Sequence, residues 1–476
     1  GLLVTANDGK DFSYVCETEV FGRPAGGFVM DPLLEVAPDG SIVTGSVQAA
    51  RASVDGGCGF ETIASLPRNF DFFGEEPPDG AEAGRVIDVC RRGAGASAPL
   101  LALVALVDET GLPLEHRIYE ARNGTDFAPL GVPIPAELLA FATTLDAAPS
   151  DPARLYVSGT LANAAVLARS LDGAESWDSV PISAADADGV LGTYLAGVAP
   201  SDPDRVIVRA SRRTLTENGY YVWDDSLLVS DDGGDAFFEV VRRNAALLGF
   251  AFANDGETLL AGYGDPRTDP ALSLPEELGI YAAPMAPANE LTFERIVADV
   301  GVSCLYATPS GLYVCATETD PLGVNATLEG DFHLGFHAGS SLPASRADFT
   351  PLLKLRDVRG PAVTLCDPEW QRVCAQFFAC DNDPRELSDG ALLCGEGDAG
   401  AGGHGGGDAG AGGHGVGGAG AGGRGDAETD ATSGDAELGC GCRAAAGART
   451  PSLVWTFAFL VMWWHKVRSK CRRSSF

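Results

Sequence analysis

The sequence predicts an all-β protein, a seven-bladed β-propeller whose first blade is incomplete. Aromatic residues that follow a turn recur at positions 12, 60, 127, 177, 237, 293 and 349, a spacing of 48 to 67 residues. Internal repeats of this length are typical of propeller blades. The composition agrees, because 61 Gly and 29 Pro with only 3 Met favour turn-rich β structure over helical bundles. We expect the propeller to occupy residues 1–360.

A first type of turn precedes most of these aromatic residues. It has the form Ala-Pro-Asp or Ala-Pro-Ser, followed by Gly or Asp-Pro, with apolar runs on both sides. Pro fixes φ, Asp caps the turn and Gly supplies a positive φ, so each copy predicts a hairpin between two strands. Clear copies occupy 36–45, 147–159 and 198–210, and looser copies occupy 252–262 and 307–316.

A second type of turn has the pattern Ser-x-Asp-x-Gly-x-x-aromatic. A carboxylate at this place accepts backbone N–H bonds, Gly allows a positive φ, and the aromatic ring packs into a neighbouring sheet. Ala174 replaces the second Gly in one copy, and only the aromatic residue remains as Phe293 and Phe349. The residues that match the pattern in the remaining positions are Asp8, Phe12, Ser53, Asp55, Gly57, Phe60, Asn123, Phe127, Ser170, Asp172, Trp177, Ser230, Asp232, Gly234 and Phe237.

This second turn resembles the Asp box of sialidase-type (BNR) propellers. In that family the boxes lie at the periphery of the blades and carry no catalysis. The resemblance therefore implies a structural role for these residues and a propeller fold, and it adds little to the case for an enzyme.

The first blade is short of two strands. Only eleven residues precede Phe12, which leaves room for a third strand before it but for no first or second strand. We expect the natural protein to extend upstream with a signal peptide and two more strands. The alternative is that residues 351–366 close the ring.

The cysteines indicate an oxidising compartment, since 12 are more than a cytosolic chain of this kind usually carries. Cys304 and Cys315 flank a turn and are candidates for a disulfide across two strands. The segment 361–394 predicts a small cap held by two disulfides among four cysteines, because no Cys-x-x-Cys pair supports the alternative of a zinc site. These four candidates are Cys366, Cys374, Cys380 and Cys394.

Residues 395–439 predict a disordered spacer. This segment is rich in Gly, nearly free of large apolar residues, and contains the repeat GDAGAGGHG twice. It cannot bury enough surface to offset its backbone entropy. His404 and His414 are interpreted as repeat residues, because a flexible Gly chain without a third fixed ligand does not make a metal site.

The last segment, 440–476, predicts a sorting or anchoring tail. An apolar run from Leu453 to Trp464, expected to form a short hydrophobic helix, is followed by a Lys/Arg cluster that would stay in the cytoplasm. With Cys440-Gly441-Cys442 ahead of it, the tail resembles the tripartite MYXO-CTERM signal of myxobacterial surface proteins. The resemblance implies processing and lipid attachment at Cys440 or Cys442, a sorting protease as a partner, contact with the membrane, and an exported protein at the cell surface or outer membrane. The many Trp and Phe residues of the run depart from that pattern.

The charge and the motifs exclude several functions. A net charge of −33 argues against nucleic-acid binding. No nucleophile elbow, P-loop or HExxH motif is present, so we expect no catalytic, cofactor-binding or metal-binding residue. Sialidase catalysis requires an Arg triad, and the pairs Arg212–Arg213 and Arg242–Arg243 are interpreted instead as solvated strand ends.

The favoured hypothesis is a non-catalytic binding or adhesion module at the cell surface, with an unknown glycan or protein as its ligand. The central face, or the Pro-rich acidic loops 67–85 and 263–280, would make the contact. The alternative is a secreted sialidase-like or other glycosidase, which would need two carboxylates about 5–10 Å apart in the central cavity. A third, weaker hypothesis is an assembly factor that holds a basic partner.

Overall fold

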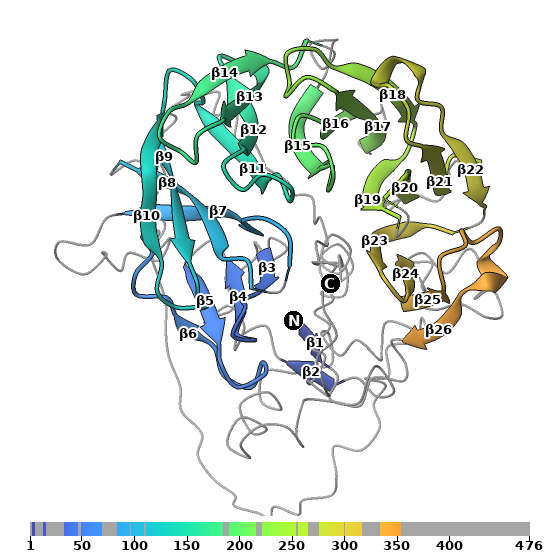
Figure 1. Cartoon of the computed structure of the whole chain (residues 1–476), viewed down its shortest axis with the longest axis horizontal. Helices are drawn as coiled ribbons and strands as arrows, with labels where there is room; N and C mark the ends of the chain where they lie inside the picture. The colour runs from blue at the N-terminus through green and yellow to red at the C-terminus, as the bar shows by residue number, and fades with distance from the viewer. Residues whose placement is uncertain are drawn as a thin grey trace, which may run out of the picture.

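The computed structural model is an all-β propeller of six four-stranded antiparallel blades arranged in a ring (Figure 1). It describes residues 2–4, 13–15 and 33–353 of the 476-residue chain, with gaps at 46–48, 69–82, 96, 109–110, 184–189, 216–220, 254–255, 265–275, 299 and 317–333. The predicted cap, spacer and tail, with Cys366, Cys374, Cys380, Cys394, Cys440 and Cys442, lie outside these residues.

Each blade consists of four strands that follow one another in the chain and pair in that order. Blade 1 contains β3 (Leu33–Val36), β4 (Ile42–Gly45), β5 (Ala50–Ser53) and β6 (Glu61–Thr62). Blade 2 contains β7 (Gly84–Arg91), β8 (Leu100–Val107), β9 (Pro113–Ala121) and β10 (Ala128–Pro135). Blade 3 contains β11 (Phe141–Ala147), β12 (Leu155–Leu161), β13 (Ala164–Ser170) and β14 (Asp178–Pro181).

The other three blades repeat this order. Blade 4 contains β15 (Val190–Val198), β16 (Val206–Leu215), β17 (Tyr221–Ser230) and β18 (Phe238–Arg243). Blade 5 contains β19 (Ala246–Phe252), β20 (Thr258–Gly264), β21 (Gly279–Pro284) and β22 (Glu294–Val297), with the short 3-10 helix η3 (Ala288–Glu290) before its last strand. Blade 6 contains β23 (Val302–Thr308), β24 (Gly311–Ala316), β25 (Leu334–Ala338) and β26 (Thr350–Leu353), with η4 (Arg346–Asp348) before its last strand.

The first strand of every blade lies at the centre of the ring and the fourth at its rim (Figure 1). A further two-stranded sheet, β1 (Leu2–Val4) with β2 (Ser13–Val15), pairs in antiparallel register. The turn residues Asp8 and Phe12 between these two strands lie outside the described residues. The structure thus describes six complete blades and two additional strands at the start of the chain.

Both types of predicted turn lie at the same end of the strands. The Ala-Pro turns join the first strand of a blade to the second, and the Ser-x-Asp turns join the third to the fourth. Antiparallel strands place these two connections on one face of the ring, which we call the basal face. The connections between second and third strands, and between successive blades, form the opposite face, which we call the loop face.

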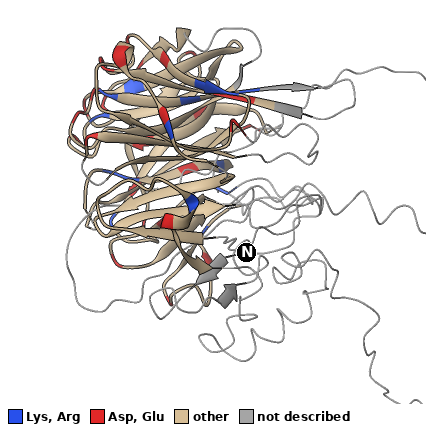
Figure 2. Cartoon of the chain, turned by 90° about the vertical axis from the view of Figure 1, so that its right-hand side faces the viewer, with Lys and Arg blue, Asp and Glu red and all other residues tan. Residues whose placement is uncertain are grey.

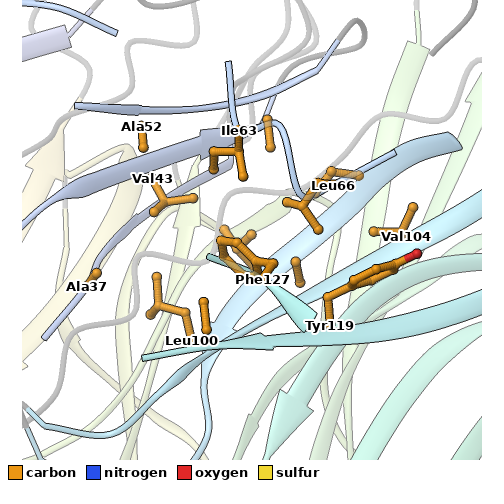
Figure 3. Packing of buried hydrophobic residues seen from close by; sticks show 14 of the residues in the cluster. Ala37, Val43, Ala52, Ile63, Leu66, Leu100, Val104, Tyr119 and Phe127 are labelled. Carbon is orange, nitrogen blue, oxygen red and sulfur yellow. The ribbon is translucent and has the colours of Figure 1, made fainter. Parts of the chain in front are cut away.

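The hydrophobic core consists of five clusters that lie between neighbouring blades. In blades 2 to 6 the repeat aromatic lies in the interface with the preceding blade. Phe127 of blade 2 packs among Val43, Ala52 and Ile63 of blade 1 (Figure 3). Trp177 of blade 3 donates from its indole N–H to the Val132 carbonyl of blade 2, at 3.1 Å. The rings of blades 2 to 6 thus pack against a neighbouring sheet. The remaining rings in such clusters are Phe237, Phe293 and Phe349.

The outer strands of blades 4 to 6 carry a bulge at the same repeat position. The register skips Val240 between its neighbours on β18, and it skips Ile296 and Leu352 in the same way on β22 and β26. Each bulged residue lies three positions after the repeat aromatic. A bulge leaves the extra residue out of the ladder and bends the strand.

Ala174 adopts the backbone conformation that Gly takes in the equivalent turns. Its φ is +75°, compared with +96° at Gly57 and +100° at Gly234. The neighbouring blade makes room for it at Gly131, where φ is +60°. A Cβ at Gly131 would lie 2.0 Å from the Ala174 carbonyl oxygen. Blades 2 and 3 therefore meet in this place through a pair of matched small residues.

The predicted disulfide between Cys304 and Cys315 is confirmed. The two residues are register partners on β23 and β24, and they are joined by a disulfide bond. The bond joins the first two strands of blade 6.

Candidate functional site

The Ser-x-Asp turns on the basal face use their polar atoms internally. In blade 1, Ser53 Oγ accepts the Gly57 N–H at 2.8 Å and donates to Asp55 Oδ1 at 2.8 Å. Asp55 Oδ1 also accepts the N–H groups of Cys58 and Gly59. In blade 4 the corresponding serine, Ser230, accepts from the Gly234 N–H and donates to Asp232 Oδ1, at 2.8 and 2.7 Å.

The same turn in blade 3 holds its carboxylate in the charged form. The Ser176 hydroxyl, then the Ser170 hydroxyl, then the Ser176 N–H donate to Asp172 and lower its pKa to about 2. Ser170 Oγ also accepts the Ala174 N–H at 2.8 Å. In blade 2, Asn123 replaces the carboxylate, and its Oδ1 accepts the N–H groups of Thr125 and Asp126. These side chains close turns, which is the use that the sequence pattern predicts for them.

Arginines on the basal face join neighbouring blades. Arg154 of blade 3 pairs with Asp204 of blade 4. Arg169 of blade 3 pairs with Asp178 and donates to the Gly233 carbonyl of blade 4 at 2.8 Å. The charged groups of this face thus hold the ring together.

Carboxylates on the inner strands also join blades. Asp88 Oδ2 on β7 accepts the Leu145 N–H of β11 at 2.8 Å. Asp146 Oδ2 on β11 accepts the Val198 N–H of β15 at 3.0 Å. Glu35 on β3 pairs with Arg91 Nε on β7 at 3.1 Å. All three carboxylates on the described inner strands therefore have a structural partner in the next blade.

A buried polar cluster lies between blades 4 and 5. The Asp225 carboxylate on β17 is fully buried, and its Oδ2 lies 2.8 Å from both Nε and Nη2 of Arg209 on β16. The same oxygen accepts the Leu247 N–H of β19 at 2.8 Å. The Arg209 guanidinium also lies over the Tyr194 ring, 5.4 Å from its centroid. We call Arg209, Asp225, Arg243, Tyr263 and Tyr281 the blade 4–5 cluster.

The blade 5 side of this cluster is aromatic. Tyr263 is fully buried and packs edge-to-face against Tyr281, with ring centroids 5.5 Å apart. Burial, followed by the negative charge of Asp225, raises the pKa of the Tyr263 hydroxyl, so it remains protonated. Arg243 on β18 covers Tyr281 at 4.8 Å from the ring centroid and lies 3.5 Å from Glu277.

Two polar atoms of the cluster make no hydrogen bond within the described part of the chain. They are Asp225 Oδ1, an acceptor, and the Tyr263 hydroxyl oxygen, and both are buried. Buried polar atoms are nearly always paired, because an unpaired one costs about 1–3 kcal/mol.

Arg212 differs from the sequence prediction. The sequence indicates a solvated strand end, yet Arg212 is only 4% exposed, and it donates to Ser226 and lies 3.7 Å from Glu239. Its position on a long central strand of blade 4, packed against blade 3, explains the burial. Arg242 fits the prediction better, since it lies at the surface and pairs with Asp224. The side chain of Arg213 lies outside the described residues.

Sequence reasoning missed Arg209, Asp225 and Tyr263 as members of one site. A signal was available for Asp225 alone. Asp225 lies two positions after Trp223 and two before Leu227, so the three side chains share one face of the strand. This face packs against a neighbouring blade. Its partners come from two other strands and from the next blade, and no local pattern joins them.

A second buried polar group lies between blades 2 and 3. His116 on β9 is 1% exposed, and its Nε2 accepts the Ala142 N–H of β11 at 3.3 Å. Burial, followed by the positive charge of Arg85, lowers the pKa of His116 to about 4. The imidazole is therefore neutral at physiological pH.

The loop face carries the longest hairpin of the ring. β16 and β17 have ten residues each, more than any other described strand. Figure 2 shows the ring from its side, with acidic and basic residues spread over its strands and connections. Two exposed leucines, Leu112 and Leu114, lie at the corresponding β8–β9 connection of blade 2, with 58% and 59% of their surface accessible.

No group of three His, Cys, Asp or Glu side chains suited to a metal ion occurs in the part of the chain that the structure describes. Within the same residues, no helix is long and apolar enough to cross a bilayer. The loops 67–85 and 263–280 fall largely in the gaps at 69–82 and 265–275, so their proposed contacts lie outside the described residues.

Comparison with solved structures gives distant similarities. The chain is 14% identical to the GH74 enzyme of Niastella koreensis, with a TM-score of 0.39, covering 66% of this chain and 45% of that one. An ancestral GH74 enzyme is 14% identical, with a TM-score of 0.38, and the match covers 71% of this chain and 38% of that one. A Dyadobacter fermentans protein of unknown function is 15% identical, with a TM-score of 0.33, and the match covers 64% of this chain and 92% of that one. The chain thus spans less than half of the two GH74 enzymes. No protein-family model and no curated protein matches it.

Proposed function

We propose that this protein is a non-catalytic binding module that meets its ligand through the loop face of the propeller. The observation that carries the proposal is the contrast between the two faces. On the basal face the Ser-x-Asp turns and the arginines Arg154 and Arg169 are used to close turns and join blades. On the loop face β16 and β17 are the longest described strands, and Leu112 and Leu114 are exposed. The basal face also exposes Val54 and Leu171, so the contrast between the faces lies in the use of polar groups and not in apolar exposure.

The inner strands support a binding role over glycoside hydrolysis. Hydrolysis requires one carboxylate to act as an acid and a second to act as a nucleophile or base. Glu35, Asp88 and Asp146 each accept hydrogen bonds from the next blade, so they serve to hold the ring. A catalytic pair made of these residues would have to break the contacts that position the strands.

Charged substitutions on each face test whether the ligand binds to the loop face. Leu112→Asp combined with Leu114→Asp would place two charges on the loop face, and Leu171→Asp places a charge on an equally exposed leucine of the basal face. Wild type and variants are screened on a glycan array and against isolated cell-surface proteins. We expect the double variant to lose the ligand that wild type and Leu171→Asp retain. Absence of any ligand for wild type, or loss in Leu171→Asp alone, would contradict the proposal.

We also propose a seventh blade, to which β1 and β2 contribute the third and fourth strands. In the six described blades the repeat aromatic always lies between the third and fourth strands, and Phe12 lies between β1 and β2. The antiparallel pairing of Leu3 with Tyr14 supports the same assignment. Within this proposal, the described turns belong to the Asp-box type that they resemble in sequence.

The location at the cell surface is proposed from the tail sequence. Support comes from Cys440 and Cys442, the apolar run and the basic cluster, in that order. Mass spectrometry of protein from intact cells tests it. A mature chain that ends near Cys442 and carries a lipid mass is expected, and a chain that ends at Phe476 would contradict the proposal.

A further inference from the structure

Cys58 takes part in a disulfide bond. It lies in the Ser-x-Asp turn of blade 1, where its N–H donates to Asp55 Oδ1 at 2.9 Å. The other described cysteines are excluded as its partner. Cys304 and Cys315 are bonded to each other, and Cys90 is a free thiol buried in the core between blades 2 and 3. The partner of Cys58 therefore lies outside the described residues.

The position of Cys58 in the repeat faces the preceding blade. Cys58 lies two residues before its repeat aromatic, as Thr125 does in blade 2 and Asp235 in blade 4. The Thr125 carbonyl accepts from Ser65 Oγ of blade 1 at 2.8 Å. Asp235 lies 2.7 Å from Arg169 Nη2 of blade 3. In both turns this position is used to bond the blade before its own.

The matching positions of the preceding blade lie shortly after its own repeat aromatic. Ser65 lies five residues after that of blade 1. Between blades 2 and 3, the Val132 N–H, also five residues after its aromatic, donates to the Ala174 carbonyl at 2.8 Å. Between blades 3 and 4, a Cβ at Gly234 would lie 3.5 Å from Val180, three residues after its aromatic. Residues three to five positions after one aromatic thus contact the turn of the next blade.

Cys16 occupies such a position at the joint that precedes blade 1. It lies four residues after Phe12, the repeat aromatic of the seventh blade proposed above. It also follows directly on β2, the fourth strand of that blade. The other cysteines outside the described residues all come after the end of blade 6, at positions that the repeat does not relate to Cys58.

We propose that Cys16 and Cys58 form a disulfide bond that joins the outer strand of the seventh blade to blade 1. The bond forms when the two thiols give up two protons and two electrons to the disulfide of an oxidising partner, which is reduced to a dithiol. A thiol reductant reverses the step and opens this joint of the ring. The inference rests on the proposed seventh blade, because Phe12 defines the repeat position of Cys16.

The described part of the seventh blade gives a reason for a covalent joint. It is the two-stranded sheet β1–β2, whereas every other described sheet has four strands. A sheet of two strands is only marginally stable in water by itself. A bond from the end of β2 to blade 1 holds this small sheet to the ring, where the larger blades are held by packing and by hydrogen bonds.

Peptide mapping of the wild-type, full-length protein tests the bond. The protein is purified without reductant, alkylated and digested below neutral pH, where few thiolates are present to exchange disulfides. We expect mass spectrometry to find one cross-linked peptide that contains Cys16 and Cys58 and that separates into its two halves on reduction. An alkylated Cys58, or a Cys58 linked to a cysteine beyond blade 6 or to a second copy of the chain, would overturn the proposal.

Hydrogen exchange measures what the bond holds. In the variant Cys16→Ala, Cys58→Ala, the amides of β1 and β2 should exchange at least about tenfold faster than in wild type. The control Cys304→Ala, Cys315→Ala removes the disulfide of blade 6 and should leave these amides within about twofold of wild type. Equal exchange in wild type and the first variant would show that the bond does not hold the sheet. The mapping uses wild type, so it tests the bond even when the variant does not fold.

The same measurements separate the bond from the seventh blade. A Cys16–Cys58 bond in a wild type whose β1 and β2 amides are unprotected would support the bond and contradict the blade. Protected amides in β1 and β2, with Cys58 bonded to another cysteine, would support the blade and overturn the bond.

Discussion

His116 and Asp225 occupy the same repeat position in two blades. Each lies on the third strand of its blade and pairs with the equivalent residue of the second strand, Ala105 for His116 and Ser211 for Asp225. Each also accepts a backbone N–H from the first strand of the following blade. An imidazole in blade 2 and a carboxylate in blade 4 thus perform one task, the joining of consecutive blades. Their different chemistry gives the two joints different responses to mutation and to pH.

The Asp225 joint should be sensitive to loss of its charge. Asp225→Ala leaves the buried Arg209 without its carboxylate and removes the acceptor of the Leu247 N–H, which should lower the free energy of unfolding by about 3–5 kcal/mol. The matched control is Asp224→Ala, which removes the surface partner of Arg242 and should cost less than about 1 kcal/mol. Urea unfolding measures both, and equal losses would contradict the assignment.

The His116 joint should respond to pH. Its pKa is about 4 when folded, below the 6.5 of an unperturbed imidazole, so the unfolded chain takes up the proton first as the pH falls. The stability that His116 provides is therefore complete above pH 6.5 and is lost as the pH falls toward 4. Between pH 7 and pH 5 this amounts to about 2 kcal/mol.

His116→Gln removes the titration and keeps a side-chain acceptor for the Ala142 N–H. We expect its unfolding free energy to fall less than that of wild type over the same pH interval. NMR titration of His116 in the folded protein gives an independent value. An imidazole that titrates near 6.5, or identical slopes for the two proteins, would show that burial does not control this residue.

Gly131 should tolerate no side chain. Gly131→Ala would place a Cβ 2.0 Å from a backbone oxygen of Ala174 at a positive φ, so we expect a loss of at least about 2 kcal/mol. Gly40→Ala is the control, because Gly40 has a φ of +86° and no atom within 4 Å of the added Cβ. Its cost should be limited to backbone strain, about 1 kcal/mol. Thermal unfolding compares the two variants, and similar shifts would mean that the contact with Ala174 relaxes freely.

The disulfide should stabilise blade 6 chiefly by restricting the unfolded chain. Its two cysteines are 11 residues apart, and closure of a loop of this length is worth about 3 kcal/mol. The variant Cys304→Ala, Cys315→Ala should lose this amount, and a reductant should lower the unfolding midpoint of wild type by more than that of the variant, in which Cys58 is still disulfide-bonded. An effect of the reductant on the variant would reveal a contribution from other disulfides.

The sequence predicted local features of the fold and missed those that join distant segments. The Ala-Pro turns and the aromatic residues depend on a few adjacent positions, so the hairpins and Phe60, Phe127, Trp177 and Phe237 could be placed in advance. Blade 2 shows the limit of this approach. Its first two strands are joined through 92–99 without an Ala-Pro turn, and only the blade repeat indicated a hairpin there.

The blade 4–5 cluster could not be predicted for the same reason. Arg209 and Asp225 are separated by 16 residues, and Leu247 and Tyr263 belong to another blade. Their meeting depends on the register of β16 with β17 and on the packing of two sheets. The charge of Arg212 predicts a solvated strand end, but β16 continues to Leu215 and Arg212 is buried within the sheet.

The position of the repeat aromatics gives the ring a direction. Because each of these rings lies against the blade before its own, a blade excised at its boundaries would lose the aromatic that seals one side and would expose its own on the other. The segment of sequence that forms one blade therefore differs from the segment that contains a blade together with the aromatic residue that covers it. A grafted segment should therefore begin at the first strand of a blade and continue through the repeat aromatic of the following blade, so that the sheet keeps the ring that packs against it.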